Sequence, residues 1–232
     1  MNRSIRVMTA NLLVDRANLT YLGNVLEVVD PDVLVTQELG HKAADLIATR
    51  FPYHDLRPQL DSKGRGIAGR LEARFGEIPL PWRAGMWARI GQGPQQWLLA
   101  NVHIRNPIVF PWWRTARLRK GQVEALLAWA DHEAGGEPFV LAGDMNASSL
   151  WPVYRRLSGR WDDLLTGSDD PEVTARPTWA WRPGWPRLLR IDHVFGVGAR
   201  AVSSQVIPLR GSDHAAVVVD LVLDRPDAPG LS

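Results

Sequence analysis

Cysteine is missing from this 232-residue chain. Disulfides, thiolate metal ligands and a thiol nucleophile are therefore excluded, and any metal site must use carboxylate, amide or imidazole groups. No apolar run approaches the roughly 20 residues that a membrane-spanning helix needs. The first residues lead straight into a strand-like stretch, without the apolar region of a signal peptide. We therefore expect a cytoplasmic protein, and a monomer.

Lysine is also scarce, and the formal net charge is only +2. A balance this small does not by itself argue for a nucleic-acid-binding protein. The distribution of charge is more informative than its total, because two stretches, 105–120 and 176–190, are rich in arginine. Both lie close in sequence to the polar residues described below, so we expect a locally positive rim around a site.

The apolar fraction of 45% is ordinary for a globular protein with a substantial core. We predict one domain over residues 1–223 and a flexible tail over 224–232. Hydrophobic periodicity predicts strands at 5–10, 32–37, 96–102, 137–142, 191–197, 201–208 and 215–223. It predicts helices at 19–29, 42–50, 114–132 and about 148–157, the last one capped by Ser148 or Ser149. Short strands are expected within 53–102, a flexible glycine-containing loop at 63–70 and an irregular loop at 158–176.

Polar residues stand at the ends of these predicted strands. Two acid–imidazole doublets, Asp192-His193 and Asp213-His214, come close together in the sequence. A carboxylate beside an imidazole fixes its tautomer and raises its basicity, and imidazole moves protons near neutral pH. Two adjacent strands can bring such doublets face to face. Together with the Gly-Asp-Met-Asn segment at 143–146 upstream, the doublets predict a hydrolytic site.

Six short motifs occur in one order along nearly the whole chain: Thr9-Ala10-Asn11-Leu12, Gln37-Glu38, Val102-His103, Gly143-Asp144-Met145-Asn146, Ile191-Asp192-His193-Val194 and Gly211-Ser212-Asp213-His214. In these motifs and their order the sequence resembles the endonuclease/exonuclease/phosphatase superfamily. The resemblance is greatest to a bacterial, phosphatase-like branch. It implies an α/β fold, a four-layer αββα sandwich of two packed mixed β-sheets flanked by helices.

The resemblance also implies metal-dependent hydrolysis of a phosphoester. Carried over by motif, Glu38 is the main metal carboxylate, Asn11 helps to bind the metal or a phosphate oxygen, and Asp213 completes the metal or water network. A hard divalent ion with oxygen ligands suits this set, with Mg²⁺ first and Mn²⁺ or Ca²⁺ as alternatives.

The same resemblance assigns the catalytic residues. Asp192 orients His214, which serves as general base or as an imidazolium that contacts phosphate. Asp144 and Asn146 position the attacking water and the phosphoryl oxygen, and His103 contacts the phosphate or assists the leaving group. The division of acid and base roles among the two histidines and Asp144 stays open.

Other polar residues have plainer interpretations. His193 follows Asp192 in a strand, so it points to the opposite side, and we expect a structural role for it. Three further histidines are expected on the surface: His41, His54 and His132. Asp162 and Asp163 lie in a predicted loop without an imidazole nearby, and we expect them to be solvated.

One departure from the family pattern concerns residues 63–78. Many family members place a carboxylate there that supports the first catalytic histidine. Here Glu72 and Glu77 are the carboxylates available, and neither aligns with that position. What orients His103 is therefore left open.

Two aromatic loops, 107–113 and 177–186, lie next to the motifs. They either pack on each other as a lid, fill the edge of the sandwich, or are exposed at the rim of the cleft. If exposed, Trp with Arg suits stacking on nucleic-acid bases, or peripheral contact with a membrane interface. Three hypotheses follow: a hydrolase of a lipid-linked or small phosphoester, a nuclease with the same site, and a binding module with a degenerate site. The chain is compact and has little room for the extra loops with which DNA-specific relatives bind a duplex, which favours the first hypothesis over the nuclease.

Overall fold

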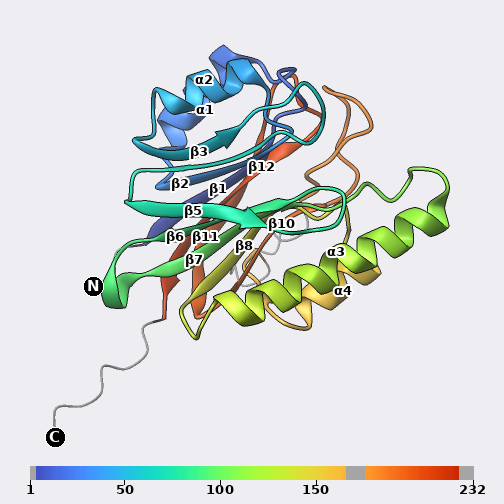
Figure 1. The fold of residues 1–232 in the computed structure, drawn as a ribbon. Helices are drawn as coiled ribbons and strands as arrows, with labels where there is room; N and C mark the ends of the chain where they lie inside the picture. The colour runs from blue at the N-terminus through green and yellow to red at the C-terminus, as the bar shows by residue number, and fades with distance from the viewer. Residues whose placement is uncertain (1–3, 166–175, 225–232) are drawn as a thin grey trace, which may run out of the picture.

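The computed structural model describes residues 4–165 and 176–224, so most of the predicted tail lies outside the described residues. Two six-stranded mixed sheets pack face to face (Figure 1). In spatial order the first sheet contains β11 (Ala199–Pro208), β12 (Ala215–Leu223), β1 (Ile5–Asn11), β2 (Val33–Gln37), β4 (Arg65–Gly69) and β3 (Tyr53–Arg57). The second contains β5 (Ala73–Ile78), β6 (Gly85–Ile90), β7 (Trp97–His103), β8 (Phe139–Asp144), β10 (Asp192–Val197) and β9 (Asp162–Asp163).

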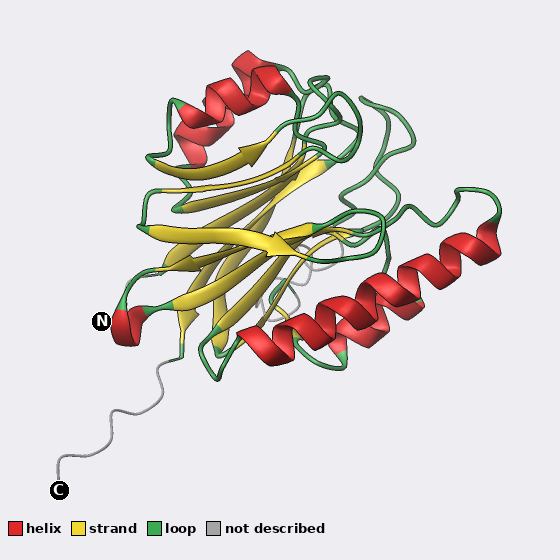
Figure 2. Cartoon of the chain, in the orientation of Figure 1, coloured by secondary structure: helices red, strands yellow, loops and turns green. Residues whose placement is uncertain are grey.

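Helices cover the outer face of each sheet (Figure 2). The first sheet is covered by α1 (Leu19–Val29) and α2 (His41–Ala48), and the second by α3 (Trp112–Glu133) and α4 (Pro152–Ser158). A short 3₁₀ helix, η1 (Gly93–Gln95), precedes β7. The predicted four-layer αββα sandwich is therefore confirmed.

Three apolar layers result from this stacking. One lies between the sheets, one between the first sheet and α1 with α2, and one between the second sheet and α3 with α4. Central strands such as β2 and β8 are buried along their whole length because both of their faces are covered. Their sequences are accordingly almost continuous apolar runs that end in polar residues.

Local sequence explains several boundaries. Asn18 caps α1 by accepting a hydrogen bond from the backbone N–H of Tyr21, and Asp30 ends the helix in a left-handed conformation before Pro31. The predicted cap of α4 is wrong. Trp151 is the N-cap, without a side-chain hydrogen bond, and Pro152 occupies the first turn, where its missing N–H costs nothing.

Two other expectations are corrected. Residues 65–69 form the buried strand β4, paired with both β2 and β3, and not a flexible loop. Gly66 permits this because a Cβ there would lie 2.6 Å from a Leu56 side-chain carbon. Within the predicted loop 158–176, Asp162 and Asp163 pair with β10 as β9, and residues 166–175 lie outside the described part of the chain.

Candidate active site

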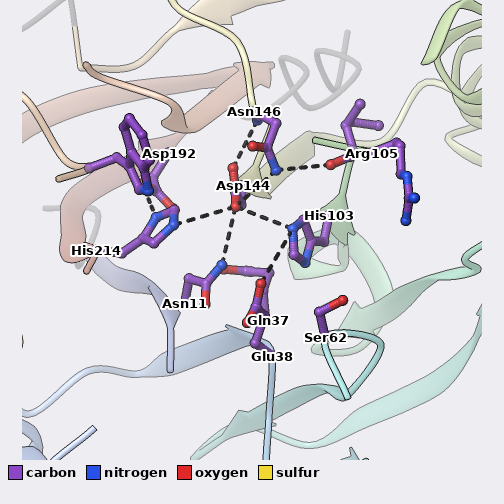
Figure 3. Close-up of polar contacts among 12 residues, drawn as sticks. Asn11, Gln37, Glu38, Ser62, His103, Arg105, Asp144, Asn146, Asp192 and His214 are labelled. Carbon is purple, nitrogen blue, oxygen red and sulfur yellow. Dashed lines mark hydrogen bonds and ion pairs between the residues drawn. The ribbon is translucent and has the colours of Figure 1, made fainter. Parts of the chain in front are cut away.

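The topology brings the polar strand ends to one edge of the sandwich. β1 runs parallel to β2, and β7 runs parallel to β8, so Asn11, His103 and Asp144 end their strands at this edge, with Glu38 directly after β2. β10 is antiparallel to β8, and its first residue, Asp192, is paired with Asp144. The predicted site residues therefore converge from both sheets (Figure 3).

Asp144 lies at the centre of the group and is fully buried. The side-chain amide of Asn11 donates to its Oδ2 at 3.1 Å, and the backbone N–H of Asn146 donates to its Oδ1 at 2.8 Å. The side-chain amide of Asn146 also lies 3.2 Å from Oδ2. Nε2 of His103 lies 3.3 Å from the same oxygen, and Nε2 of His214 lies 3.8 Å from it. One carboxylate thus contacts four of the other predicted site residues.

His214 forms an acid–imidazole pair with Asp192. Its Nδ1 lies 2.9 Å and 3.1 Å from the two carboxylate oxygens of Asp192. The expected arrangement on adjacent strands is wrong, because Asp192 begins β10 in one sheet and His214 precedes β12 in the other. The pair therefore crosses the interface between the sheets.

Backbone contacts fix both members of this pair. The Ser212 hydroxyl accepts the N–H of His214 at 3.0 Å and donates to the Asn11 carbonyl at 2.8 Å. The Thr178 hydroxyl accepts the N–H of Asp192 at 3.2 Å. These hydroxyls hold the imidazole and its carboxylate in place from outside the strands themselves.

Burial and neighbouring charges shift the pKa values of His214, Asp144 and His103 in different directions. Burial alone would lower the pKa of His214, but the carboxylates of Asp192 and Asp144 outweigh it and raise that pKa to about 10. Burial raises the pKa of Asp144 to about 7, although His214 opposes the rise. Burial, together with Arg83 and His214, holds the pKa of His103 well below its ordinary value. At neutral pH, then, His214 is an imidazolium and His103 is neutral.

Glu38 has a strained backbone, with φ at +49°, a region that non-glycine residues rarely adopt. Its carbonyl accepts the N–H of Val14, which fixes the turn after β2. The side chain is half-buried, its Oε1 lies 4.0 Å from Nε2 of His103, and burial raises its pKa. A cation beside this carboxylate would offset the cost of burying it.

Asp213 has one carboxylate oxygen that accepts a hydrogen bond within the described structure and one that does not. Its Oδ2 accepts the indole N–H of Trp179 at 3.3 Å, whereas its Oδ1 is buried and has no hydrogen-bond partner among the described residues. A different trio has ligand atoms within 4.8 Å of one another: Asp144, Asp192 and His214. In that trio, however, Asp192 already pairs with a protonated imidazole, which cannot coordinate a metal through that nitrogen.

A polar cleft of about 260 Å³ opens beside these residues. Besides six of the predicted site residues it is lined by four residues that the sequence did not indicate: Ser62, Trp82, Arg83 and Asn106. Val109 and Trp179 also line it, and they belong to the two aromatic loops that were expected at its rim. Arg105, from the first basic stretch, also lines it. Arg83 lies in a turn between β5 and β6 that carries no motif. Its only sequence signal is a Trp-Arg dipeptide, which does not by itself indicate a site.

The first basic stretch does not form a uniformly exposed rim. Arg119 is buried, and its guanidinium donates to the backbone carbonyls of Arg105 and Asn146. Burial lowers its pKa to about 10. It therefore holds two site segments together from behind.

The carboxylates in residues 63–78 do not reach His103. Glu77 pairs with Arg57 at 2.6 Å and Arg65 at 2.7 Å, and Glu72 accepts from the amide of Gln92. Nδ1 of His103 is buried without a hydrogen-bond partner among the described residues. The first histidine is thus positioned through Nε2, near Asp144, and not by a carboxylate behind it.

The remaining polar residues divide as follows. The expected surface histidines are exposed: His41, His54 and His132. His193 is fully buried on the helix side of its sheet, where Nε2 contacts the Ala147 carbonyl at 2.8 Å, in agreement with a structural role. The prediction for Asp163 is wrong: it is buried and accepts from Arg190 and the Tyr154 hydroxyl, each at 2.8 Å.

The aromatic loops are exposed and do not pack on each other as a lid. Five rings are each more than half exposed: Phe110, Trp112, Trp113, Trp181 and Trp185. Ring pairs among the described residues of these loops occur within a loop, as between Phe110 and Trp113 at 5.7 Å. None of the helices in the described part of the chain has the length and apolarity needed to cross a membrane.

The model of the Endonuclease/Exonuclease/phosphatase family matches residues 8–214, which covers most of the chain and all the predicted site residues. The chain belongs to this family. Its members act on phosphoesters, so membership supports phosphoester hydrolysis as the reaction class. A search among curated proteins finds no significant match.

Solved structures share the fold at low sequence identity. A functionally unknown conserved protein from Enterococcus faecalis V583 is 16% identical, with a TM-score of 0.75 over 94% of this chain and 100% of that one. The human nocturnin catalytic domain with bound sulfate is 16% identical, with a TM-score of 0.74 over 95% and 94%. A mannosyl-6-phosphatase from Bacteroides thetaiotaomicron is 18% identical, with a TM-score of 0.70 over 95% and 100%.

Proposed function

We propose that this member of the family is a metal-dependent hydrolase of lipid-linked or small phosphoesters. The observation that carries the proposal is the convergence of His214, its partner Asp192 and the central Asp144 beside one cleft that Glu38 also lines. A phosphoester is anionic and repels nucleophiles, so its hydrolysis needs charge neutralisation, an activated water and stabilisation of the leaving group. This cleft offers groups for each requirement.

Glu38, Asn11 and Asp213 are the residues that would hold a divalent cation. Each of these side chains offers an oxygen atom as a metal ligand, which suits a hard ion such as Mg²⁺, with Mn²⁺ or Ca²⁺ as alternatives. The buried Oδ1 of Asp213, which has no hydrogen-bond partner among the described residues, is available for such an ion. When bound, such an ion would supply Lewis-acid neutralisation of phosphoryl charge.

Asp144 and the two histidines have different roles in the proposed reaction. The pKa of Asp144, near 7, suits a general base that accepts a proton from water, with Asn146 beside it to orient that water. The imidazolium of His214, held by Asp192, suits contact with the charge that develops on the phosphoryl oxygens. Neutral His103 faces the same space and suits a contact with phosphate or the leaving group.

The exposed aromatic loops bear on the substrate. Exposed tryptophan rings near arginines suit a membrane interface, where lipid-linked phosphoesters lie, and peripheral membrane contact belongs to this proposal. The same rings could stack on bases, which keeps a nuclease as the second candidate. One neighbour in fold is named as a phosphatase, the mannosyl-6-phosphatase from Bacteroides thetaiotaomicron. A degenerate binding module ranks last, because the polar residues of all six motifs are present.

A substrate panel tests the proposal. Hydrolysis of DNA, RNA, phospholipid vesicles and small phosphoesters would be measured with Mg²⁺, Mn²⁺ or Ca²⁺, and again with EDTA. We expect turnover of small or lipid phosphoesters that EDTA abolishes. Turnover of nucleic acid alone, with binding that weakens steeply as salt rises, would instead support the nuclease. Failure of every substrate with every metal would contradict the hydrolase.

A further inference from the structure

Arg83 is a buried cation that the proposed mechanism leaves unused. It is 6% exposed and lines the same cleft as Glu38 and Asp144. Its Nη2 donates to the Ser62 hydroxyl at 2.9 Å, but its Nε and Nη1 are buried without a hydrogen-bond partner among the described residues. Burying guanidinium donors without partners costs free energy, so such an arrangement needs a compensating contact.

No carboxylate in the described structure supplies that contact. The charges of Glu38 and Asp144 act on Arg83, yet neither forms an ion pair with it within 4 Å among the described residues. The guanidinium and the two carboxylates line the same cleft. Burial lowers the pKa of Arg83 to about 10, so the group stays protonated at neutral pH.

A second guanidinium is held beside the first. The Trp82 ring lies 4.5 Å from the guanidinium carbon of Arg83 and 3.9 Å from that of Arg105, measured to the ring centroid. Trp82 itself has a φ of +69°, a strained conformation for a bulky residue. The indole face offsets part of the repulsion between two like charges. Both arginines and this ring line the cleft.

We propose that Arg83 and Arg105, held by Trp82, form an anion subsite for the unesterified oxygens of a phosphomonoester. The inference rests on the proposed function and narrows its substrate class. Guanidinium groups bind phosphate oxygens through paired N–H donors, and a monoester carries nearly twice the charge of a diester at pH 7. Arg83 lines the cleft but is only 6% exposed, so we expect the small terminal oxygens of a monoester to reach it more readily than an ester substituent would.

Inorganic phosphate is the probe that separates binding from catalysis. Its affinity for the full-length, metal-free protein in EDTA would be measured by isothermal titration calorimetry. We expect Arg83→Gln and Arg105→Gln each to raise the Kd for phosphate on the order of tenfold or more. A change of this size corresponds to the loss of one charge-assisted hydrogen bond. Arg83→Lys should lie between Arg83→Gln and the wild type, because it keeps the charge and loses the fork of donors.

The control is Arg200→Gln, which removes the same charge from an exposed position in β11 outside the cleft. It should bind phosphate as the wild type does. Circular dichroism would check that each variant folds, and Arg105→Gln and Arg83→Lys carry the test if Arg83→Gln does not fold. Absence of phosphate binding in the wild type, or wild-type affinity in the folded variants, would overturn the subsite.

Kinetics then assign the substrate class. With p-nitrophenyl phosphate and bis(p-nitrophenyl) phosphate, which share a leaving group, we expect a higher kcat/KM for the monoester. Arg83→Gln should lower the monoester value about tenfold and the diester value less. A preference for the diester would overturn the monoester assignment.

Glycerol 3-phosphate and vesicles containing phosphatidic acid would distinguish a soluble source of the phosphomonoester from a lipid one. Phosphate binding without turnover of any ester would support the subsite and overturn the proposed hydrolase function.

Discussion

Asp162 and Asp163 are neighbours in sequence but have opposite environments. The first is exposed, whereas the second is buried against Arg190, His193 and Tyr154 behind β10, the strand that carries Asp192. Burial alone would raise the pKa of Asp163, but His193 and Arg190 outweigh it and hold that pKa well below its ordinary value. Its ionised form therefore stabilises the folded state.

We predict that Asp163→Asn lowers the free energy of unfolding by about 3 kcal/mol at pH 7, because it breaks a buried ion pair. The folded-state pKa lies below the unfolded value of about 3.9, so this stability is fully present above about pH 5. It is lost as the pH falls below about 4, and the difference from wild type should shrink there. Urea denaturation across pH would measure it.

Asp162→Asn is the matched control and should change stability by less than about 0.5 kcal/mol, as exposed substitutions usually do. Two outcomes would contradict a stabilising ion pair at Asp163. One is an equal change in the free energy of unfolding for both substitutions, and the other is an effect of Asp163→Asn that does not depend on pH.

Single residues were predictable where a local rule applied. The alternation of side chains along a strand correctly placed His193 away from Asp192. The environments of Arg83 and Asp163 were not predictable, because they are made by partners distant in sequence, such as Ser62 for the first and Arg190 for the second. Charge and residue type alone did not distinguish these side chains from solvated ones.

At the scale of elements, β8 positions the site through Gly143, the residue before Asp144. Gly143 has a φ of +143°, and a Cβ there would lie 2.0 Å from the Val102 carbonyl oxygen in the neighbouring strand β7. The close approach of β7 and β8 is what places His103 opposite Asp144. A side chain at this glycine would push the two apart.

We therefore predict that Gly143→Ala destabilises the protein by about 3 kcal/mol or more, through overpacking and backbone strain together. Gly136→Ala is the control. Gly136 also has a positive φ, +88°, but nothing lies within 4 Å of its would-be Cβ, so only the backbone term of about 1 kcal/mol applies. Equal unfolding midpoints and slopes for both variants in urea would contradict the role of the close approach.

The elements that periodicity predicts best are long and regular. Helix α1 and strand β12 have the predicted bounds, and α3 is only slightly longer than predicted. The errors fall where tertiary pairing overrides local preference: Gly64, Gly66 and Gly69 suggested a loop, yet β4 is held between β2 and β3. Strand β9 is two residues long and carries no periodicity at all.

For the whole molecule, the two sheets share both the core and the site. Buried hydrogen bonds cross between them, from Asn11 to Asp144 at 3.1 Å and from Gln37 to Asn101 at 2.7 Å. The sequence predicted which residues would meet, through the family resemblance. It could not show that Asp192 and His214 come from different sheets, because strand neighbours in space are not readable from spacing.

The shared core leads us to predict that residues 1–223 unfold as one domain. Far-UV circular dichroism and tryptophan fluorescence should report coincident transitions in urea, and activity should be lost in the same range. Two separate transitions, one for each sheet, would contradict a single domain.

We propose that His214 and Glu38 act in one hydrolytic site. The most direct test compares kcat/KM of the wild type, His214→Ala and Glu38→Ala on the phosphoester that is turned over fastest. His132→Ala removes an exposed histidine and serves as the control. We predict that each site variant loses roughly 10²-fold to 10⁴-fold while the control keeps wild-type activity. Wild-type turnover in both site variants would show that neither residue takes part in hydrolysis.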